Sequence, residues 1–412
     1  MIEYEKFELE NGLKILFHQD ETTPLAVVNL LYNVGARDEE EDRTGFAHLF
    51  EHLMFGGSAN IPNFDAPLQM VGGECNAFTN NDITNYYEVL PAENIETALW
   101  LESDRMLELA FTPKSLEVQR GVVIEEFKQR YLNQPYGDVW LNFRPLIYKT
   151  HPYQWATIGK SIEHIEGASM QEVKDFFYEH YAPNNATLVI GGNLQLEAVK
   201  SMVNKWFGDI PRREIKPRNW KPEAPQNDKR ELELERDVPS NAVYIAFRMG
   251  GRTSEDHYFG DLCTDLLAGS KSSRLYQRLV VKDRLFSSIS SYITGALEDG
   301  LLIINGHLSD DISFEQAERS IWEELEKLMI HEIEEMELQK VKNKHKTGKV
   351  FGEQNLLNRV MKIAFFENMG KLEELNNELE TYDAITPLNL QLFLQRTISP
   401  NKQSILRVKK TS

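Results

Sequence analysis

The sequence predicts an α+β protein of two homologous domains, each a mostly antiparallel sheet with helices packed on one face. Its 412 residues suit two domains of about 200 residues better than a single one. Predicted strands alternate with helices, in hairpins as well as in crossovers, which is typical of α+β domains. A strand ending in Gly-x-Arg, followed by an acidic loop and a helix, occurs in each half, which indicates a duplication.

Composition and charge indicate a globular protein whose partners are neither nucleic acid nor membrane. Apolar residues make up 41% of the chain and charged residues 26%, as in ordinary globular domains. The net charge of −19 argues against nucleic acid and anionic membrane as partners. Cys75 and Cys263 lie far apart in the sequence, so neither a disulfide framework nor a cysteine zinc site is expected.

The N-terminus and the apolar runs predict where the protein resides. The first residues lack the basic segment and apolar run of a secretory signal peptide. No apolar run approaches the length of a membrane span. We therefore expect a cytoplasmic protein, or a periplasmic one if a signal peptide has been removed.

Local patterns predict the elements of the first half in order. The turn at Asn11 and Gly12 joins two predicted strands over 7–18, and the apolar run 26–34 predicts a central strand. Further along, the patterns predict a helix over 45–55, a short helix at 64–71, two strands within 72–90, long helices after Pro91 and Pro113, a capped helix from Ser169, a strand at 186–192 and a helix at 194–207.

Residues 212–237 differ in composition and predict a linker. The segment is rich in charge, poor in apolar residues and contains Pro217, Pro222 and Pro225. The predicted division is an N-terminal domain at 1–211, the linker at 212–237 and a C-terminal homologous domain at 238–412.

The second half repeats the order of the first without its histidines. Residues 241–252 predict a strand that ends in Gly-x-Arg, and an acidic loop follows. A helix near 259–267 then takes the place of the helix at 45–55, but it carries no metal ligands. We therefore expect one active copy and one inactive copy.

The stretch from His48 to His52 reads H-x-x-E-H and indicates metal chemistry. Histidines four residues apart leave the same face of a helix, so both rings can bind one zinc ion. Glu51 borders that face, where its carboxylate could accept a proton from a water activated by the metal. Thr44 could cap the start of this helix, and the two glycines after Phe55 could end it.

The alternative is a helix with two structurally satisfied histidines and a solvated glutamate. The rest of this helix is apolar, and three polar groups on one buried-looking face need a reason, because burying unpaired polar groups is costly. A glutamate directly before the second histidine is typical of inverted zinc peptidases. The pattern therefore favours a zinc site with one ion per chain.

The third ligand has to come from elsewhere in the chain. A zinc hydrolase site uses three protein ligands and leaves a position open for water. Glu125 and Glu126 are the candidates, since both lie on a predicted helix with an apolar stripe. The residues alone leave both open.

Several segments together resemble one known family. They lie at 45–58, 72–79, 121–126, 150–153, 158–159, 184–192, 207–211 and 268–279. With them the chain resembles the pitrilysin, insulin-degrading enzyme and mitochondrial processing peptidase family, in its short bacterial form. The resemblance implies a duplicated metallopeptidase fold and a zinc metalloendopeptidase that cleaves unfolded peptides.

The resemblance also implies roles for particular residues. His48, His52 and Glu126 correspond to the zinc ligands, and Glu51 to the base. Glu125 is then a structural or supporting acid. Gln119 stands where the family often has a glutamate seven residues before the third ligand, which could weaken tuning of the site.

The segment formed by Asn76, Ala77, Phe78 and Thr79 resembles the edge strand on which such peptidases lay their substrate. Adding a strand holds a peptide through its backbone with little demand on its sequence. Without the family, the plainer interpretation of this segment is a half-buried strand.

One feature of the family is missing from the second half. Members place an arginine, and seven residues later a tyrosine, where they hold the substrate carbonyl and its developing charge. Here the corresponding positions are Val280 and Ser287, and no shifted register restores the pair. This pattern resembles the zinc-bearing subunit of a heterodimer whose paralogous partner lacks zinc and supplies the two residues. The alternatives are a self-sufficient homodimer that uses Arg278 or Arg284, and a non-catalytic core or assembly subunit.

Overall fold

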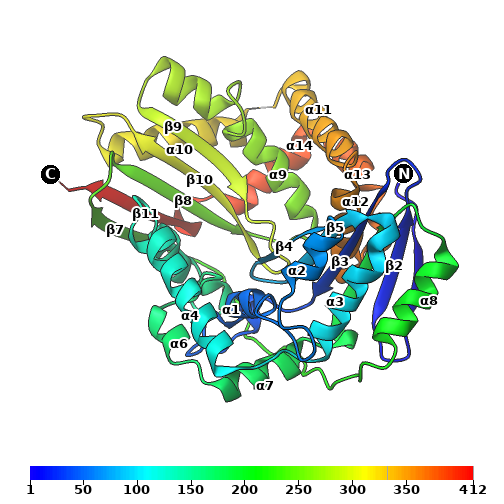
Figure 1. Cartoon of the computed structure of the whole chain (residues 1–412). Helices are drawn as coiled ribbons and strands as arrows, with labels where there is room; N and C mark the ends of the chain where they lie inside the picture. Colours follow the sequence, from blue (N-terminus) through cyan, green and yellow to red (C-terminus); the bar gives the residue numbers. More distant parts are fainter. Residues whose placement is uncertain (332, 412) are drawn as a thin grey trace. The chain divides into compact units, whose positions relative to one another are not determined.

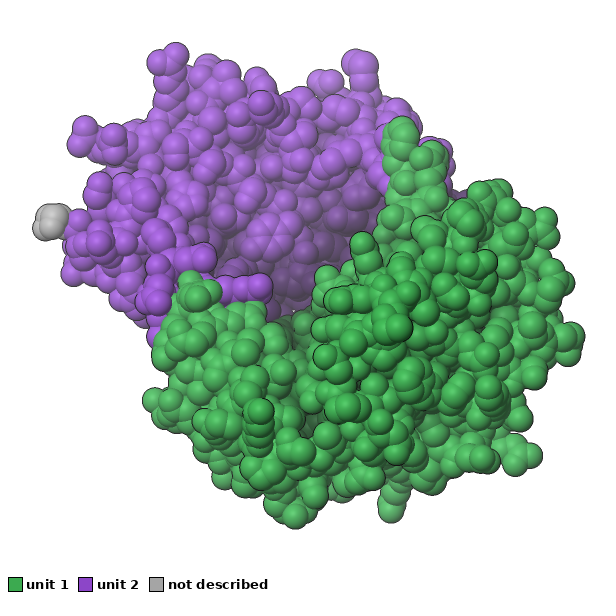
Figure 2. All heavy atoms as spheres, in the orientation of Figure 1, with its two compact units in different colours: residues 1–129, 155–220, 350–376 green, residues 130–154, 221–349, 377–412 purple. Residues whose placement is uncertain are grey.

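The computed structural model describes residues 1–331 and 333–411, which form two compact units. Unit 1 comprises Met1–Gln129, Trp155–Trp220 and Val350–Asn376; unit 2 comprises Arg130–Gln154, Lys221–Lys349 and Asn377–Ser412 (Figure 2). Each unit thus contains a segment from the other half of the sequence. No helix in the described ranges is long and apolar enough to cross a membrane.

Unit 1 is built on a six-stranded sheet with the order β1-β2-β6-β3-β5-β4. The strands are β1 (Glu5–Glu8), β2 (Lys14–Gln19), β3 (Leu25–Tyr32), β4 (Glu74–Thr79), β5 (Thr84–Pro91) and β6 (Ala186–Gly192). Only β2 and β6 pair in parallel, and the other neighbours are antiparallel. The apolar strand β3 lies inside the sheet, whereas β4 lies at its edge.

Helices cover both faces of this sheet. They are α1 (Phe46–Leu53), α2 (Asp65–Met70), α3 (Ile95–Leu107), α4 (Pro113–Phe127), α6 (Ile162–Glu166), α7 (Met170–His180), α8 (Leu196–Phe207) and α12 (Leu356–Asn368). On one face, Val27 and Leu31 of β3 pack with Val360 of α12. On the other, Tyr86 of β5 pairs across from Leu30 of β3, and the Arg105 guanidinium of α3 lies 4.3 Å from the Tyr86 ring centroid.

Unit 2 is built on a five-stranded sheet with the order β7-β11-β8-β10-β9. The strands are β7 (Arg230–Arg236), β8 (Ala242–Met249), β9 (Phe286–Ile293), β10 (Gly300–Leu308) and β11 (Gln403–Lys410). Its helices are α5 (Val139–Ile147), α9 (Glu255–Leu267), α10 (Phe314–Ile330), α11 (Glu335–Gly352), α13 (Glu378–Ala384) and α14 (Pro387–Thr397). Here β7 and β11 form the parallel pair.

Helices also pack on both faces of the sheet of unit 2. Ile245 and Phe247 of β8 belong to one apolar core with Leu262 of α9. The alternate residue, Tyr244, belongs to a second core with Phe143 of α5. Residues alternate between the faces of a strand, so α9 and α5 pack on opposite faces.

The predicted fold class is confirmed, with one addition. Both sheets are mainly antiparallel, and the predicted elements of the first half are present. However, the sheets are not covered on one face alone, because α5 and α12 supply the second layer. Each of these helices comes from the half of the chain that supplies the other unit's sheet, as the orange α12 beside the blue strands illustrates (Figure 1).

The structure also differs from the predicted linker and from the predicted domain boundaries. Residues 212–229 contain neither helix nor strand, but the rest of the predicted linker contains β7, which pairs with β11. Alternation of glutamate with leucine and arginine made β7 look like a solvated linker, whereas it is a sheet edge. The division at 1–211 and 238–412 stays a prediction about the two sequence halves, and the compact units depart from it by two segments.

Candidate metal centre

The helix α1 carries His48, Glu51 and His52 and is anchored by its apolar residues. Phe46, Ala47, Leu49, Phe50 and Leu53 are buried, while the three polar residues stay partly exposed. The helix begins after Gly45, whose φ of +89° lies in the left-handed region. A Cβ there would lie 2.7 Å from the Ile158 carbonyl oxygen, so both conformation and space require glycine.

The expected cap by Thr44 is wrong. The Thr44 hydroxyl accepts a hydrogen bond from the backbone N–H of Lys160 at 2.8 Å and lies 2.8 Å from Nδ1 of His164. The Thr44 hydroxyl is therefore bound by Lys160, which precedes α6, and by His164 within α6. The first turn of α1 is capped instead by Glu39, which accepts from the backbone N–H groups of Gly45 and Ala47 at 2.9 and 2.8 Å.

The structure brings His48, His52 and Glu126 together. Oε2 of Glu126 lies 3.6 Å from Nε2 of His48 and 3.4 Å from Nε2 of His52. The donor atoms all lie within 4.8 Å of one another, and no other such group of three occurs in the described residues. The side chains are 12%, 23% and 19% exposed, so the cluster is reachable from solvent.

This donor set fits zinc. Two imidazole nitrogens and one carboxylate oxygen are a common ligand set of catalytic zinc, which keeps a further position open. The spacing of the three donors around a common centre is compatible with simultaneous binding of one ion. The third donor comes from α4, which packs against α1.

Glu125 and Glu126 point in different directions. Glu125 is 62% exposed in its side chain and forms an ion pair with Lys128 at 2.7 Å. Neighbouring residues of a helix leave it about 100° apart, so only one of the two can face α1. The structure places Glu126 there. Gln119, two turns earlier, lies beside Gly56, where an added Cβ would be 3.8 Å from its Nε2.

Glu51 lies near two buried tyrosines. Burial raises the pKa of Tyr86 well above its usual value, and the charge of Glu51 contributes to the rise. Burial raises the pKa of Tyr181 as well, again with a contribution from the charge of Glu51. The Glu51 carboxylate is therefore close enough to both buried tyrosines to affect their pKa values.

The segment of Asn76, Ala77, Phe78 and Thr79 belongs to β4, the edge strand. It pairs with β5 on one side, with Ala77 opposite Tyr86. Asn76 and Phe78 are exposed, while Ala77 and Thr79 are half-buried on the other side of the strand. The helix α1 contacts β4, so this edge lies beside the helix that carries the metal donors.

In unit 2, Val280 packs in a helical segment and Ser287 lies on a strand. Val280 lies in the π-helical segment Tyr276–Lys282 and packs against the apolar core. Ser287 is exposed on β9, and its hydroxyl donates to the His307 carbonyl at 3.3 Å. Arg278 is held in ion pairs by Asp283, Glu323 and Glu324.

The helix α9 corresponds in the sequence repeat to α1 of unit 1. Each helix follows a strand and a Gly-x-Arg sequence, β3 before α1 and β8 before α9. Its residues Asp261 and Asp265, also four apart, face His345 of α11. The imidazole Nδ1 lies 3.4 Å from Asp261 and its Nε2 lies 3.0 Å from Asp265. Lys344 adds a second cation at 2.6 Å from Asp265, so side-chain cations neutralise the aspartates.

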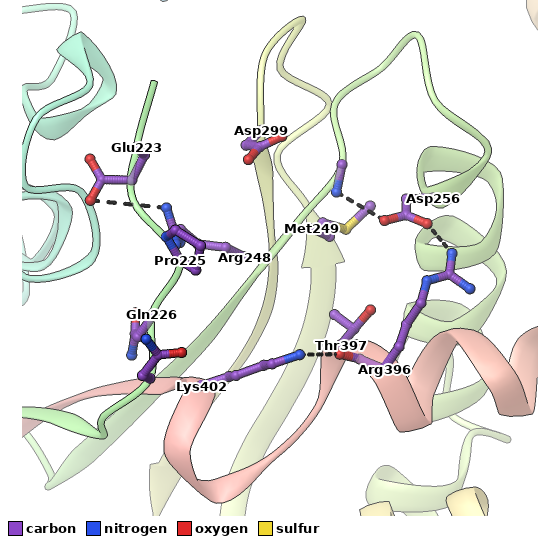
Figure 3. A pocket seen from close by; sticks show the side chains of 12 residues that line it. Glu223, Pro225, Gln226, Arg248, Met249, Asp256, Asp299, Arg396, Thr397 and Lys402 are labelled. Atoms are coloured by element: carbon purple, nitrogen blue, oxygen red, sulfur yellow. Dashed lines mark hydrogen bonds and ion pairs between the residues drawn. The ribbon is translucent and has the colours of Figure 1, made fainter. Parts of the chain in front are cut away.

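Unit 2 also contains a cavity of about 470 Å³ lined by both polar and apolar groups (Figure 3). Several of its charged groups are engaged by one another or by the backbone. Arg396 pairs with Asp256, and Lys402 donates to the Arg396 carbonyl at 2.5 Å. Glu223 accepts from the backbone N–H groups of 149–151. None of the metal donors belongs to this unit.

Comparison with known families assigns the chain. Residues 14–139 match the family model "Insulinase (Peptidase family M16)", and residues 167–344 match "Peptidase M16 inactive domain". The chain belongs to the M16 peptidase family. The resemblance in the sequence is thereby confirmed, as is the expectation of a zinc peptidase with an active and an inactive copy.

Two bacterial proteins are among the relatives of this M16 peptidase. "Zinc protease PqqE" of Helicobacter pylori is 29% identical over 82% of this chain and 78% of its own length. "Uncharacterized zinc protease YmxG" of Bacillus subtilis is 24% identical over 95% of this chain and 96% of its own. Both are described as zinc proteases, which agrees with the donor set at His48, His52 and Glu126.

Solved structures agree on the fold. A protease from Helicobacter pylori superposes with a TM-score of 0.94 at 26% identity, over 99% of this chain and all of that one. Pitrilysin superposes with a TM-score of 0.80 at 21% identity, over 99% of this chain but 45% of its own. The M16 chain therefore spans about half the length of pitrilysin.

Proposed function

We propose that this M16 chain is the catalytic subunit of a heterodimeric zinc endopeptidase that cleaves unfolded peptides. The observation that carries the proposal is the convergence of His48, His52 and Glu126, with Glu51 on the same helix turn. The donor set is complete within one chain, whereas Val280 and Ser287 replace the arginine and tyrosine that the family resemblance implies.

The residues of the site have separable roles. When bound, zinc polarises the scissile carbonyl and lowers the pKa of the attacking water. Glu51 accepts the proton that water loses as its oxygen attacks the carbonyl carbon. It then delivers that proton to the leaving nitrogen as the C–N bond breaks.

The edge strand β4 is the proposed binding surface for the peptide. Its outer edge has no neighbouring strand among the described residues, so its backbone can pair with an extended chain. Backbone pairing makes little demand on sequence but requires an unfolded segment. Asn76 and Phe78 are exposed on one side of the strand, whereas Ala77 and Thr79 face the side of Tyr86.

The proposed partner would supply what unit 2 lacks. A missing donor to the developing oxyanion typically costs about 100-fold or more in rate. The chain alone is therefore expected to cleave peptides slowly, and a paralogous chain with the arginine and tyrosine should restore the rate.

The test uses purified chain, with and without that paralogue, on a fluorogenic unstructured peptide. Glu51→Gln should retain zinc and lose turnover, because it keeps the shape of the side chain but cannot accept the proton. Glu125→Gln is the matched control, since Glu125 faces solvent, and it should retain both.

The outcomes separate the alternatives. In one outcome, the chain alone is fully active, with an activity that rises with protein concentration as the chain dimerises. That result would favour a homodimeric peptidase and contradict the heterodimer. Absence of zinc from the wild-type chain, with no cleavage under either condition, would favour a core or assembly subunit.

A further inference from the structure

Glu39 is a buried acidic residue that accepts hydrogen bonds from the backbone at the start of α1. It is 7% exposed and forms no ion pair with any described residue. Its two oxygens accept hydrogen bonds from the N–H groups of Gly45 and Ala47 at 2.9 and 2.8 Å. The nearby charges are already paired, Arg37 with Asp82 and Asp38 with Arg218.

Such a group is expensive to keep. Burial raises the pKa of Glu39 to about 8, although the two backbone N–H groups and the Trp155 side chain oppose the rise. A serine or asparagine at the start of α1 could cap the helix without burying a charge. Capping alone therefore does not explain a glutamate supplied from the preceding loop.

The location of the capped turn suggests the reason. The helix starts at Phe46, so His48 is its third residue and lies within the first turn, whereas His52 lies in the last. The first turn is where a helix frays, because its N–H groups have no partners within the helix. It is also the positive end of the helix dipole, which disfavours a cation bound nearby.

The geometry points to Glu39 as a positioning residue of the metal centre. Its carboxyl group fixes the turn that carries His48, because it accepts from two N–H groups at the positive end of the helix. Glu39 touches neither the metal donors nor the substrate, and it acts through the backbone of Gly45 and Ala47. This inference rests on the proposed zinc site and adds a residue that its sequence motif does not contain.

The surroundings of Glu39 favour a rigid arrangement. Gly45 is confined by Ile158 and Ile165, and Thr44 is held by Lys160 and His164. The indole N–H of Trp155 donates to the Ala36 carbonyl at 2.8 Å and ties down the loop that carries Glu39. The start of α1 is thus enclosed, and Glu39 supplies the acceptors for its N–H groups.

The test compares Glu39→Gln with Glu172→Gln in the otherwise intact chain. Glu172 also caps a helix of unit 1, since it accepts from the backbone N–H of Ser169 at the start of α7 at 2.8 Å. Zinc affinity is measured by competition with a chromophoric chelator on metal-free protein. The absorption spectrum of the cobalt-loaded proteins reports the ligand geometry.

We expect Glu39→Gln to weaken zinc binding about 10-fold to 100-fold, the usual range for residues that support metal ligands. The cobalt spectrum should shift in the same variant. Glu172→Gln should change zinc affinity less than about 2-fold and leave the spectrum unchanged, because its helix bears no donor.

Equal zinc affinities and spectra for wild type and Glu39→Gln would overturn the inference, even if the metal-free variant unfolds at a lower temperature. If Glu39→Gln does not fold, Glu39→Asp is measured in the same way, and wild-type affinity and spectrum despite the shortened side chain would overturn it equally. Failure of the proposed function looks different, because the wild-type chain itself would then not bind zinc.

Discussion

The Oε2 atom of Glu126 lies 3.4 Å from Nε2 of His52, although the two residues belong to different helices. This contact defines the candidate metal centre, since it joins the motif on α1 to a possible third donor on α4. It also distinguishes Glu126 from its neighbour Glu125, which pairs with Lys128 at the surface.

The first prediction concerns these two glutamates. Glu126→Gln replaces an anionic donor with a weak neutral one, so zinc affinity should fall by at least about 10-fold. Glu125→Gln removes the same charge one residue away and should leave affinity unchanged. Zinc content after dialysis against a weak chelator measures both, and equal loss in the two variants would contradict the assignment.

A second prediction concerns the buried charges beneath the zinc helix. Arg105 pairs with Glu102 and lies 3.4 Å from Glu88, and all three are fully buried. Burial, with the charge of Glu102, raises the pKa of Glu88 well above its usual range, which favours the neutral form of this carboxyl group. Glu102→Gln should therefore destabilise the protein by about 3–5 kcal/mol, because it leaves Arg105 unpaired.

The matched change for this cluster is Glu88→Gln. It replaces a neutral carboxylic acid with an amide of the same shape, so the expected cost is about 1 kcal/mol or less. Urea denaturation of both variants measures the difference. Similar losses for the two would mean that Glu88 is ionised in the folded protein.

A third prediction concerns Gly45 at the start of the metal helix. Gly45→Ala forces a left-handed conformation on a residue with a Cβ, which costs about 1–2 kcal/mol, and the added methyl group clashes with Ile158 and Ile165. Gly121→Ala is the control, because Gly121 lies inside α4 with open space around it. That change should stabilise the protein by about 0.5–1 kcal/mol. Thermal unfolding of the two variants should therefore shift in opposite directions.

A fourth prediction concerns pH and the His345 cluster. Burial lowers the pKa of His345, but the hydrogen bond with Asp265 and the charge of Asp261 outweigh it, so the net pKa is raised above 6.5. The protonated form is thus favoured by folding. The contribution of protonated His345 to the stability of the folded protein is complete below about pH 6.5. It is lost as the pH rises through the higher pKa that His345 has in the folded state.

The groups around His345 define the control. The charge of Lys344 opposes protonation of His345. The Tyr382 ring stacks on the imidazole with the ring centroids 4.9 Å apart, and its hydroxyl donates to Asp261. The charge of His345 in turn lowers the pKa of His257. His345→Gln removes the titrating group, so the stability difference between wild type and variant should be larger at pH 6 than at pH 9. A difference independent of pH in urea denaturation would show that His345 does not carry a charge in the folded state.

Much of the local structure could be predicted from the sequence. The apolar run of β3, the capping box of Ser169 and Glu172, and the turn at Asn11 and Gly12 each act over a few residues, and each is present. The spacing of His48 and His52 belongs to this class, because four residues along a helix bring two side chains to one face whatever lies around them.

Other features could not be predicted because they depend on segments far apart in the chain. The pattern of β7 resembles that of a solvated linker until β11 pairs with it. The helices α5 and α12 each pack on the sheet of the unit formed mainly by the other half of the sequence. The sequence does not reveal this, because an amphipathic helix has the same apolar periodicity whichever sheet it packs on. Glu39 looked like part of an acidic loop, and only its contacts with Gly45 and Ala47 distinguish it.

The sequence by itself determined the helix with His48, Glu51 and His52, the two α+β repeats and the family to which they belong. These follow from short-range periodicity and from motif spacing, which the unfolded chain already contains. Only the tertiary structure decided that Glu126 rather than Glu125 meets the histidines and that Glu39 rather than Thr44 caps their helix. The physical reason is that both choices depend on which atoms lie within about 3–4 Å after α1 packs against segments that are distant in sequence.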